Sequence, residues 1–298
     1  MMSAAASLGL SLLWDTDIGL SHVDKYTYSS EEHIKAGALL ATGLLNSGVR
    51  TEADAAVALL GDYITNPSLS LKTASIVGLG LAYVGSHRED LLALLLPAVA
   101  DDSTSTEIAA LSALSLGFIF VGSGNGEITS IILQTLMERD EKSLGDQWGR
   151  YLALGLALLY VGKYVQRCFS GRHTDPKCLG LQDASDATLE TLKAIEHPIS
   201  KQAQILVEVC SFAATGNVLR IQKLLHLCGE HLEAVKEREE GAKEEKKDEK
   251  KDEQKEDEQK PDDTFLSFAV LGISIIATGE EIGSEMSMRQ FNHLVGFE

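Results

Sequence analysis

The chain is patterned by a recurring run of small and aliphatic residues that closes on a glycine. Within a run nearly every position is apolar or small, whereas an amphipathic helix would show one apolar stripe, so each run predicts a helix buried on all sides. Consecutive runs are separated by polar turns and one amphipathic stretch. The clear copies occupy residues 35–50, 71–85, 107–122, 148–162, 202–216 and 265–279, and residues 4–14 form a degenerate first copy. Repetition of this kind is typical of a solenoid.

The closing glycines provide a measure of the repeat. They are Gly48, Gly85, Gly122, Gly162, Gly216 and Gly279, and their spacings are 37, 37, 40, 54 and 63. Glycine suits such a position because it ends a helix in the left-handed conformation without Cβ strain. The short spacings define one helical hairpin per unit, so we predict an all-α chain: an α-solenoid of hairpins with a period of about 36 residues.

Small residues recur at two places before each closing glycine. Five residues before it stand Gly43, Gly80, Gly117, Ala157, Ser211 and Ser274, and seven before it stand Ala41, Gly78, Ser115, Gly155, Val209 and Gly272. Small side chains there allow neighbouring inner helices to approach closely. The second helix of each unit is predicted at 51–65, 88–100 and 127–139, the first of these with Thr51 as N-cap.

The two long spacings each contain an insertion. Residues 236–263 are almost entirely Lys, Glu, Asp and Gln, and without apolar side chains they are expected to be disordered. Removing these 28 residues reduces the spacing of 63 to 35. The predicted organisation is therefore repeats over 1–235, a disordered insertion at 236–263, and a last repeat of the same solenoid at 264–298.

Residues 164–181 form the other insertion, and removing these 18 residues reduces the spacing of 54 to 36. We hypothesise that they are an unspliced intron, since Lys-Tyr-Val can be encoded with a splice-donor sequence and Leu-Gln with an acceptor. A genuine surface loop is the alternative, because lengthening a loop costs little free energy. The helical stretch 183–195 would then be the outer helix of that unit.

Charge and composition narrow the classes of partner. The net charge of −18 argues against nucleic acid, whose phosphates require Lys and Arg, and favours basic or mixed-charge proteins. The longest apolar runs are about 14 residues, short of the roughly 20 of a membrane span, and the first 14 residues lack the basic region of a signal peptide. Four scattered cysteines favour a reducing compartment.

Catalytic and metal-binding chemistry is not indicated. Cys168, His173 and Cys178 are zinc-type ligands, but their spacing is unusual and a fourth ligand is missing, so a loop is the better interpretation. No nucleophile elbow, metalloprotease or kinase signature occurs. We expect no catalytic residue, no metal and no cofactor.

One predicted outer helix carries a candidate recognition stripe. Glu127, Ile131, Gln134 and Glu138 are spaced 4, 3 and 4 residues apart and therefore share one face. An acidic, amide and aliphatic stripe suits a small domain whose apolar patch is ringed by Lys and Arg, although a merely solvated face is the simpler interpretation. Asp15, Asp17 and Asp24 form a second acidic cluster, with the same alternative.

The repeated pattern A-G/S-x-L-x-L-G-L-x-x-x-G resembles the proteasome/cyclosome repeat. That repeat occurs in the two large non-ATPase subunits of the proteasome regulatory particle and in the largest subunit of the anaphase-promoting complex. Longer stretches resemble the smaller of the two proteasome subunits, at residues 12–20, 24–49, 78–90, 216–228 and 277–294. The resemblance implies a closed or incomplete α-toroid with inner and outer helix rings.

The resemblance also implies a function and its residues. It implies a non-catalytic scaffold in the cytoplasm and nucleus that docks on the proteasomal ATPase ring and other regulatory-particle subunits. Its partners would be ubiquitin chains, ubiquitin-like shuttle factors and a deubiquitinase. The ubiquitin or ubiquitin-like site would comprise Glu127, Ile131, Gln134 and Glu138 with Asp102 and Ser103, and deubiquitinase docking would use Asp15 and Asp17. The alternative is a purely structural solenoid of the proteasome or anaphase-promoting complex that does not bind ubiquitin.

Overall fold

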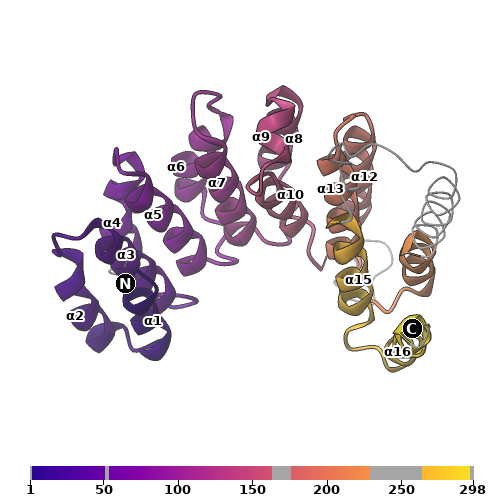
Figure 1. Cartoon of the computed structure of the whole chain (residues 1–298), viewed down its shortest axis with the longest axis horizontal. Helices are drawn as coiled ribbons and strands as arrows, with labels where there is room; N and C mark the ends of the chain where they lie inside the picture. Colours follow the sequence, from indigo (N-terminus) through magenta and orange to yellow (C-terminus); the bar gives the residue numbers. More distant parts are fainter. Residues whose placement is uncertain (1, 51–53, 163–175, 229–263, 296–298) are drawn as a thin grey trace, which may run out of the picture. The chain divides into compact units, whose positions relative to one another are not determined.

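The computed structural model describes residues 2–50, 54–162, 176–228 and 264–295, and all regular structure within these ranges is helical. This confirms the all-α prediction. The described residues fall into two compact units (Figure 1). One comprises those of 1–161 and 174–207, and the other those of 162–173 and 208–298. The division lies within a single helix, between Val207 and Glu208.

The helices follow the predicted order of inner and outer elements. The inner series is α1 (Met2–Ser11), α3 (Glu32–Leu45), α5 (Leu69–Ala82), α7 (Thr106–Ile119), α10 (Gly149–Leu158), α13 (Pro198–Ser211) and α15 (Thr264–Ala277). The outer series is α2 (Thr16–Thr27), α4 (Ala55–Leu60) with the 3-10 helix η1 (Gly61–Thr65), α6 (Glu89–Ala100), α8 (Gly126–Glu138), α12 (Pro176–Lys193) and α16 (Glu281–Val295). A short helix, α9 (Glu141–Gly145), precedes α10, and residues 218–228 are also helical.

Within the first unit the inner helices α1, α3, α5, α7 and α10 pack in chain order (Figure 1). The outer helices α2, α4 with η1, α6 and α8 lie against them as a second layer. The central inner helices α5 and α7 are buried almost all round, as the uniform apolar pattern predicts, and α8 buries only one face. The first inner helix, α1, departs from this prediction, because Ser3, Ser7 and Leu10 are exposed. Closure of the repeats into a toroid stays a prediction.

The small residues set the distance between neighbouring inner helices. The residue five positions before one closing residue packs against the residue seven positions before the closing residue of the next repeat. A Cβ added to Gly43 would lie 2.3 Å from the carbonyl oxygen of Gly78, and one added to Gly117 would lie 2.6 Å from that of Gly155. These are backbone contacts too close for any side chain, so the predicted close approach is confirmed.

Each closing glycine adopts a left-handed conformation, with φ between 60° and 84°. It lies two to five residues after the last helical residue, because a short turn follows each helix. Backbone hydrogen bonds from this turn join consecutive repeats. The N–H of Gly85 donates to the carbonyl oxygen of Phe118 at 3.0 Å, and the N–H of His87 donates to that of Ile119 at 3.1 Å. We call this pair of bonds the backbone tie.

The backbone tie shows that the register predicted for the fifth copy, residues 202–216, is wrong. It recurs from Gly122 and Gly124 to α10 and, in the second unit, from Ala214 and Gly216 to the end of α15. Ala214, with φ of 56°, therefore occupies the closing position, and Gly216 is the second donor. The sequence pattern missed this shift because a glycine two residues later matched the template, while alanine gives no such signal.

The degenerate first copy closes on a residue other than glycine. Trp14 lies five residues after Gly9, has φ of 70° and is 71% exposed. Its indole Nε1–H donates to the carbonyl oxygen of Ser47 at 3.2 Å, which joins the first repeat to the second.

The outer helix predicted at 51–65 is shorter than expected. Thr51, its predicted cap, lies outside the described residues, and the helix begins after Asp54, whose φ is 46°. It changes to 3-10 geometry at Gly61, a residue with low helix propensity. Residues 88–100 and 127–139 match α6 and α8 to within one residue.

The two proposed insertions are only partly described. The charged insertion at 236–263 lies outside the described residues, as do residues 164–175 of the other one. Residues 176–181 are the first residues of α12, so this helix begins before the predicted 183. In the described parts of the chain, none of the helices has the length and apolarity that crossing a membrane requires.

Candidate functional site

The helix α8 is fixed at its N-terminus by a side-chain cap. The carboxamide oxygen of Asn125 accepts hydrogen bonds from the N–H groups of Glu127, at 2.9 Å, and Ile128, at 3.3 Å. The Thr129 hydroxyl donates to the backbone oxygen of Asn125 at 2.8 Å. Capping satisfies N–H groups that have no partner within the helix, so α8 begins at a defined residue and its exposed face has a defined direction.

The four predicted stripe residues share the exposed face of α8. Glu127, Gln134 and Glu138 are exposed and Ile131 is half-buried, whereas Ile128 and Ile132 face the core. The Gln134 Nε2 donates to Glu138 Oε1 at 2.8 Å, which orients both side chains along the helix. The face therefore presents two carboxylates, an amide and an aliphatic side chain in one row.

The C-terminal end of α8 is joined to the turn that carries Asp102 and Ser103. The Arg139 guanidinium donates to the Thr106 hydroxyl at 3.2 Å and to the backbone oxygens of Thr104, at 3.2 Å, and Asp101, at 3.4 Å. Asp102 and Ser103 are exposed beside these carbonyls. The structure thus brings these two residues and the end of the α8 stripe onto one surface, a combination that the family resemblance implied and the helical spacing alone did not predict.

Asp101 organises the same turn. Its carboxylate accepts hydrogen bonds from the hydroxyl of Ser103, at 2.6 Å, and from its N–H, at 2.9 Å. These bonds lower the pKa of the exposed Asp101 carboxyl, so this group is ionised at neutral pH. The surface between α8 and the turn is consequently acidic.

The second predicted cluster lies on α2. Asp15 caps this helix by accepting a hydrogen bond from the N–H of Ile18 at 3.4 Å, and Asp17 lies exposed in its first turn. The helix α2 packs on α1 and α3, whereas α8 packs on α6, α10 and α12. The structure therefore does not combine Asp15 and Asp17 with the α8 stripe, and they remain a separate candidate surface.

The sequence pattern missed two exposed residues of the α8 face. Ser130 is exposed, and Met137 is 52% exposed beside Glu138. They lie three residues after Glu127 and Gln134, so extending the helical spacing to i+3 would have found them. Met137 adds a flexible apolar contact next to the carboxylates.

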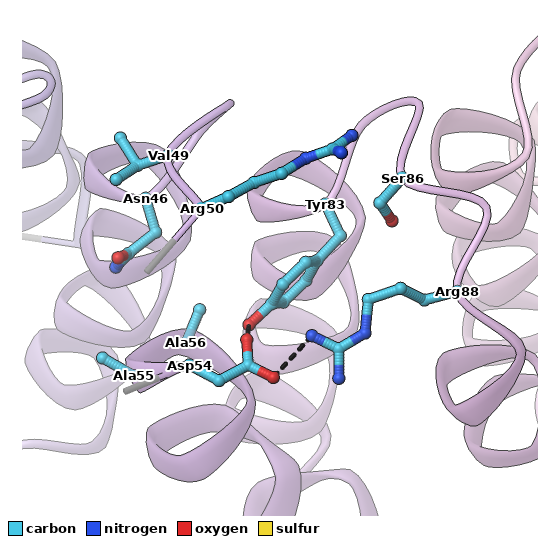
Figure 2. A pocket seen from close by; sticks show the side chains of 9 residues that line it. All are labelled: Asn46, Val49, Arg50, Asp54, Ala55, Ala56, Tyr83, Ser86 and Arg88. Atoms are coloured by element: carbon cyan, nitrogen blue, oxygen red, sulfur yellow. Dashed lines mark hydrogen bonds and ion pairs between the residues drawn. The ribbon is translucent and has the colours of Figure 1, made fainter. Parts of the chain in front are cut away.

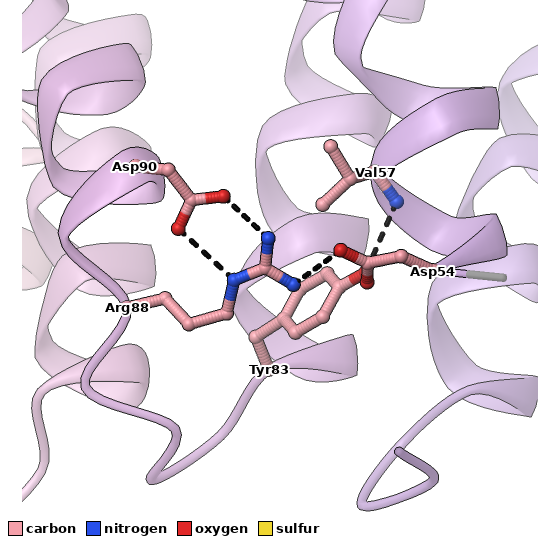
Figure 3. Close-up of polar contacts among 5 residues, drawn as sticks. All are labelled: Asp54, Val57, Tyr83, Arg88 and Asp90. Carbon is pink, nitrogen blue, oxygen red and sulfur yellow. Dashed lines mark hydrogen bonds and ion pairs between the residues drawn. The ribbon is translucent and has the colours of Figure 1, made fainter. Parts of the chain in front are cut away.

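A polar cluster between α4 and α6 was also missed (Figure 3). The Tyr83 hydroxyl donates to Asp54 Oδ1 and accepts from the Val57 N–H at 3.1 Å. The Arg88 guanidinium donates to Asp54 Oδ2 at 2.5 Å, and through its Nε to Asp90 Oδ1 at 3.0 Å. These residues are far apart in the sequence, so only folding brings them together.

Ionisation within this cluster follows from its hydrogen bonds. Burial alone would raise the pKa of Asp54, but hydrogen bonds from Tyr83 and Arg88 outweigh it and lower the pKa. A hydrogen bond from Arg88 likewise lowers the pKa of Asp90. Burial, followed by the hydrogen bond to Asp54, raises the pKa of Tyr83. At physiological pH the cluster therefore contains a neutral Tyr83 and two ionised carboxylates, Asp54 and Asp90, which both pair with Arg88.

Metal-binding and cysteine chemistry have little support in the described part of the chain. It contains no group of three or more His, Cys, Asp or Glu side chains placed to hold a metal ion. Burial raises the pKa of the Cys210 thiol to about 12 and also raises that of Cys228, so neither forms a thiolate readily. Cys168 and His173 lie outside the described residues.

Residues 74–108, which contain most of α5, all of α6 and the start of α7, match the proteasome/cyclosome repeat. This segment of the chain is therefore a proteasome/cyclosome repeat. This confirms the resemblance suggested by the glycine-closed runs.

Relatives that are similar over the whole chain are named as regulatory subunits of the 26S proteasome. The chain is 49% identical over 297 residues to 26S proteasome regulatory subunit rpn1 of Schizosaccharomyces pombe, covering 100% of the chain and 29% of the relative. It is 38% identical over 295 residues to 26S proteasome non-ATPase regulatory subunit 2 of Dictyostelium discoideum, covering 99% of the chain and 28% of the relative. The chain thus spans less than a third of the length of these curated relatives.

Proposed function

We propose that this chain is the repeat region of a non-catalytic regulatory subunit of the 26S proteasome and a receptor for ubiquitin and ubiquitin-like domains. The relatives named as 26S proteasome regulatory subunits support the first part. The exposed stripe of α8 carries the second part, because its carboxylates flank the aliphatic Ile131 and suit a basic-rimmed apolar patch.

The face described above defines the proposed binding surface. It comprises the α8 stripe, with Ser130 and Met137, and the turn with Asp102 and Ser103. Ile131 and Met137 would contribute apolar contact, and Glu127 and Glu138 would pair with Lys or Arg of the partner. Its exposed carboxylates would mainly speed association, so binding should weaken as ionic strength rises.

The experiment is an NMR titration of the 298-residue chain with ubiquitin and, separately, with the ubiquitin-like domain of a shuttle factor. We expect shifts confined to α8 and residues 101–104. The double variant Glu127→Arg/Glu138→Arg should weaken binding by at least about tenfold, since like charges then face each other. Glu281→Arg/Glu285→Arg on exposed helix α16 changes the net charge equally and is the matched control.

Two results would contradict the receptor proposal. One is an absence of shifts on α8, and the other is equal loss of affinity in the α8 and α16 double variants. Either would favour the alternative, a structural solenoid that supports assembly of the proteasome or anaphase-promoting complex without binding ubiquitin.

Other interactions belong to the same proposal. Asp15 and Asp17 would dock a deubiquitinase, and Asp17→Arg should weaken that contact while leaving the α8 site intact. The remaining surfaces would contact the proteasomal ATPase ring and other regulatory-particle subunits in the cytoplasm and nucleus. Asp17 is the better residue to change, because Asp15 also caps α2.

A further inference from the structure

One junction between inner helices differs from those that follow it. The backbone tie joins α5 to α7 and α7 to α10, through the turns at Gly85 and Gly122. The same register at the α3–α5 junction would pair the N–H groups of Gly48 and Arg50 with the last carbonyls of α5. Among the described residues, no hydrogen bond joins these two N–H groups to α5.

A cavity of about 230 Å³ occupies this untied junction (Figure 2). Its lining comes from the end of α3, the start of α4 and the turn after α5. The residues that matter for its chemistry are Asn46, Arg50, Asp54, Tyr83, Ser86 and Arg88. The helices nevertheless touch at Gly43 and Gly78, so the opening is confined to the ends of the helices where the tie is missing.

Some polar groups of the cavity have hydrogen-bond or ion-pair partners, and others have none among the described residues. Asp54, Tyr83 and Arg88 are bonded to one another, and Arg88 is also bonded to Asp90. The buried Ser86 Oγ has no hydrogen-bond partner among the described residues. In that same part of the chain, neither an ion pair nor a hydrogen bond engages the exposed Arg50 guanidinium.

The unsatisfied groups define the charge of a ligand. Two carboxylates face Arg88, and among the described residues none pairs with Arg50, whose side chain extends toward the segment carrying Tyr83 and Ser86 (Figure 2). The Ser86 hydroxyl can donate a hydrogen bond, and a guanidinium offers a fork of donors that matches a carboxylate. A cavity of this size is below the roughly 300–1,000 Å³ of pockets that hold drug-sized ligands, so it suits a single residue.

We propose that this cavity binds a peptide carboxylate, with Arg50 pairing with the carboxylate oxygens and Ser86 donating to one of them. The ring of Tyr83, held by Asp54 and Val57, forms a wall beside that carboxylate. An acidic side chain and a free chain terminus offer the same chemistry. The site is separate from the α8 face, because it lies between α3, α4 and the turn after α5.

Four short peptides test the proposal on the 298-residue chain. Acetyl-triglycine with a free carboxylate is compared with its amide, and acetyl-Gly-Glu-Gly amide is compared with its Gln counterpart. We expect the Arg50 Nε–H and Ser86 amide signals to shift with the two carboxylate peptides and not with the two neutral ones. The tighter of the two carboxylate peptides identifies the source of the group.

Variants assign the residues. Arg50→Ala should weaken carboxylate binding about tenfold, as expected for a hydrogen bond to a charged partner, and Ser86→Ala should weaken it about threefold. Arg50→Lys keeps the charge but loses the fork, so an intermediate affinity is expected. Arg289→Ala, on the exposed surface of α16, is the matched control and should leave binding unchanged.

Three results would overturn the proposal: equal shifts with the amide peptides, unchanged affinity in folded Arg50→Ala, or tighter binding of inorganic phosphate than of either carboxylate. The Glu127→Arg/Glu138→Arg variant should bind these peptides as the unmodified chain does. Failure of the α8 proposal is therefore distinguishable from failure of this one.

Discussion

At the scale of single residues, glycine has two separate uses in this chain. At Gly48 and Gly85 it permits a left-handed turn, whereas at Gly43 and Gly117 the backbone of the next helix occupies the place of a side chain. Sequence spacing reveals both positions but not which neighbour is touched. The contact partner is set by the offset between consecutive helices, which is a property of the packed repeats.

Gly43→Ala should destabilise the fold by about 1–3 kcal/mol, the usual cost of overpacking, because the new Cβ would lie 2.4 Å from the Gly78 Cα. Gly61→Ala is the control. Nothing lies within 4 Å of its added Cβ and its φ is −55°, so a gain of about 0.4–1 kcal/mol is expected. Urea unfolding measures both, and equal effects would contradict the assigned contact.

Arg88 should stabilise the fold in a pH-dependent manner. Its partners Asp54 and Asp90 have lowered pKa values, so their contribution is present above the unfolded pKa of about 3.9 and is lost as pH falls through the folded values. Arg88→Met should cost about 1 kcal/mol at pH 7, since the pairs are partly exposed, and progressively less below pH 4. Urea midpoints of both proteins across pH 3–7 test this, and a pH-independent difference would refute it.

At the scale of elements, α8 shows how a predicted helix becomes a defined surface. Its periodicity predicted that Glu127, Gln134 and Glu138 share a face, and the structure places that face outward. The position of Asp102 and Ser103 beside it depends instead on Arg139, which joins α8 to carbonyls of the preceding turn. No local pattern encodes such a contact, because its partners are more than thirty residues away.

Asn125→Ala should destabilise the chain by about 1 kcal/mol, because the N–H groups of Glu127 and Ile128 lose their acceptor. Asn125→Asp retains a capping oxygen and should be nearly neutral or stabilising, since a negative charge is favourable at a helix N-terminus. Thermal unfolding and hydrogen exchange of the first turn of α8 measure the effect. Equal losses in both variants would show that the cap does not act through its side-chain oxygen.

At the scale of the whole molecule, the repeat period gives the expected spacing against which the insertion at 164–181 is measured. With Ala214 as the closing residue, the spacing from Gly162 is 52, and removing 18 residues leaves 34, close to the period of the other units. The spacing argument for an insertion therefore survives the correction of register.

Deleting residues 164–181 should retain the helical signal in circular dichroism and change Tm by no more than about 4 °C, which corresponds to roughly 1 kcal/mol for a protein of this size. Twelve residues of α12 remain, from Gln182 to Lys193. Deleting residues 126–143, also 18 residues, removes α8 and should abolish cooperative unfolding. Loss of cooperativity in the first deletion would mean that 164–181 belongs to the repeat.

The sequence by itself determined the all-α class, the hairpin period, the closing glycines and the face of α8, because each follows from spacing within one helix or between adjacent turns. Only the tertiary structure decided the fifth closing residue, the surface joining α8 to the turn at 101–104, and the cavity at Arg50 and Ser86. These depend on which backbone and side-chain groups of separate repeats meet. That is set by packing between helices, and a one-dimensional pattern does not contain it.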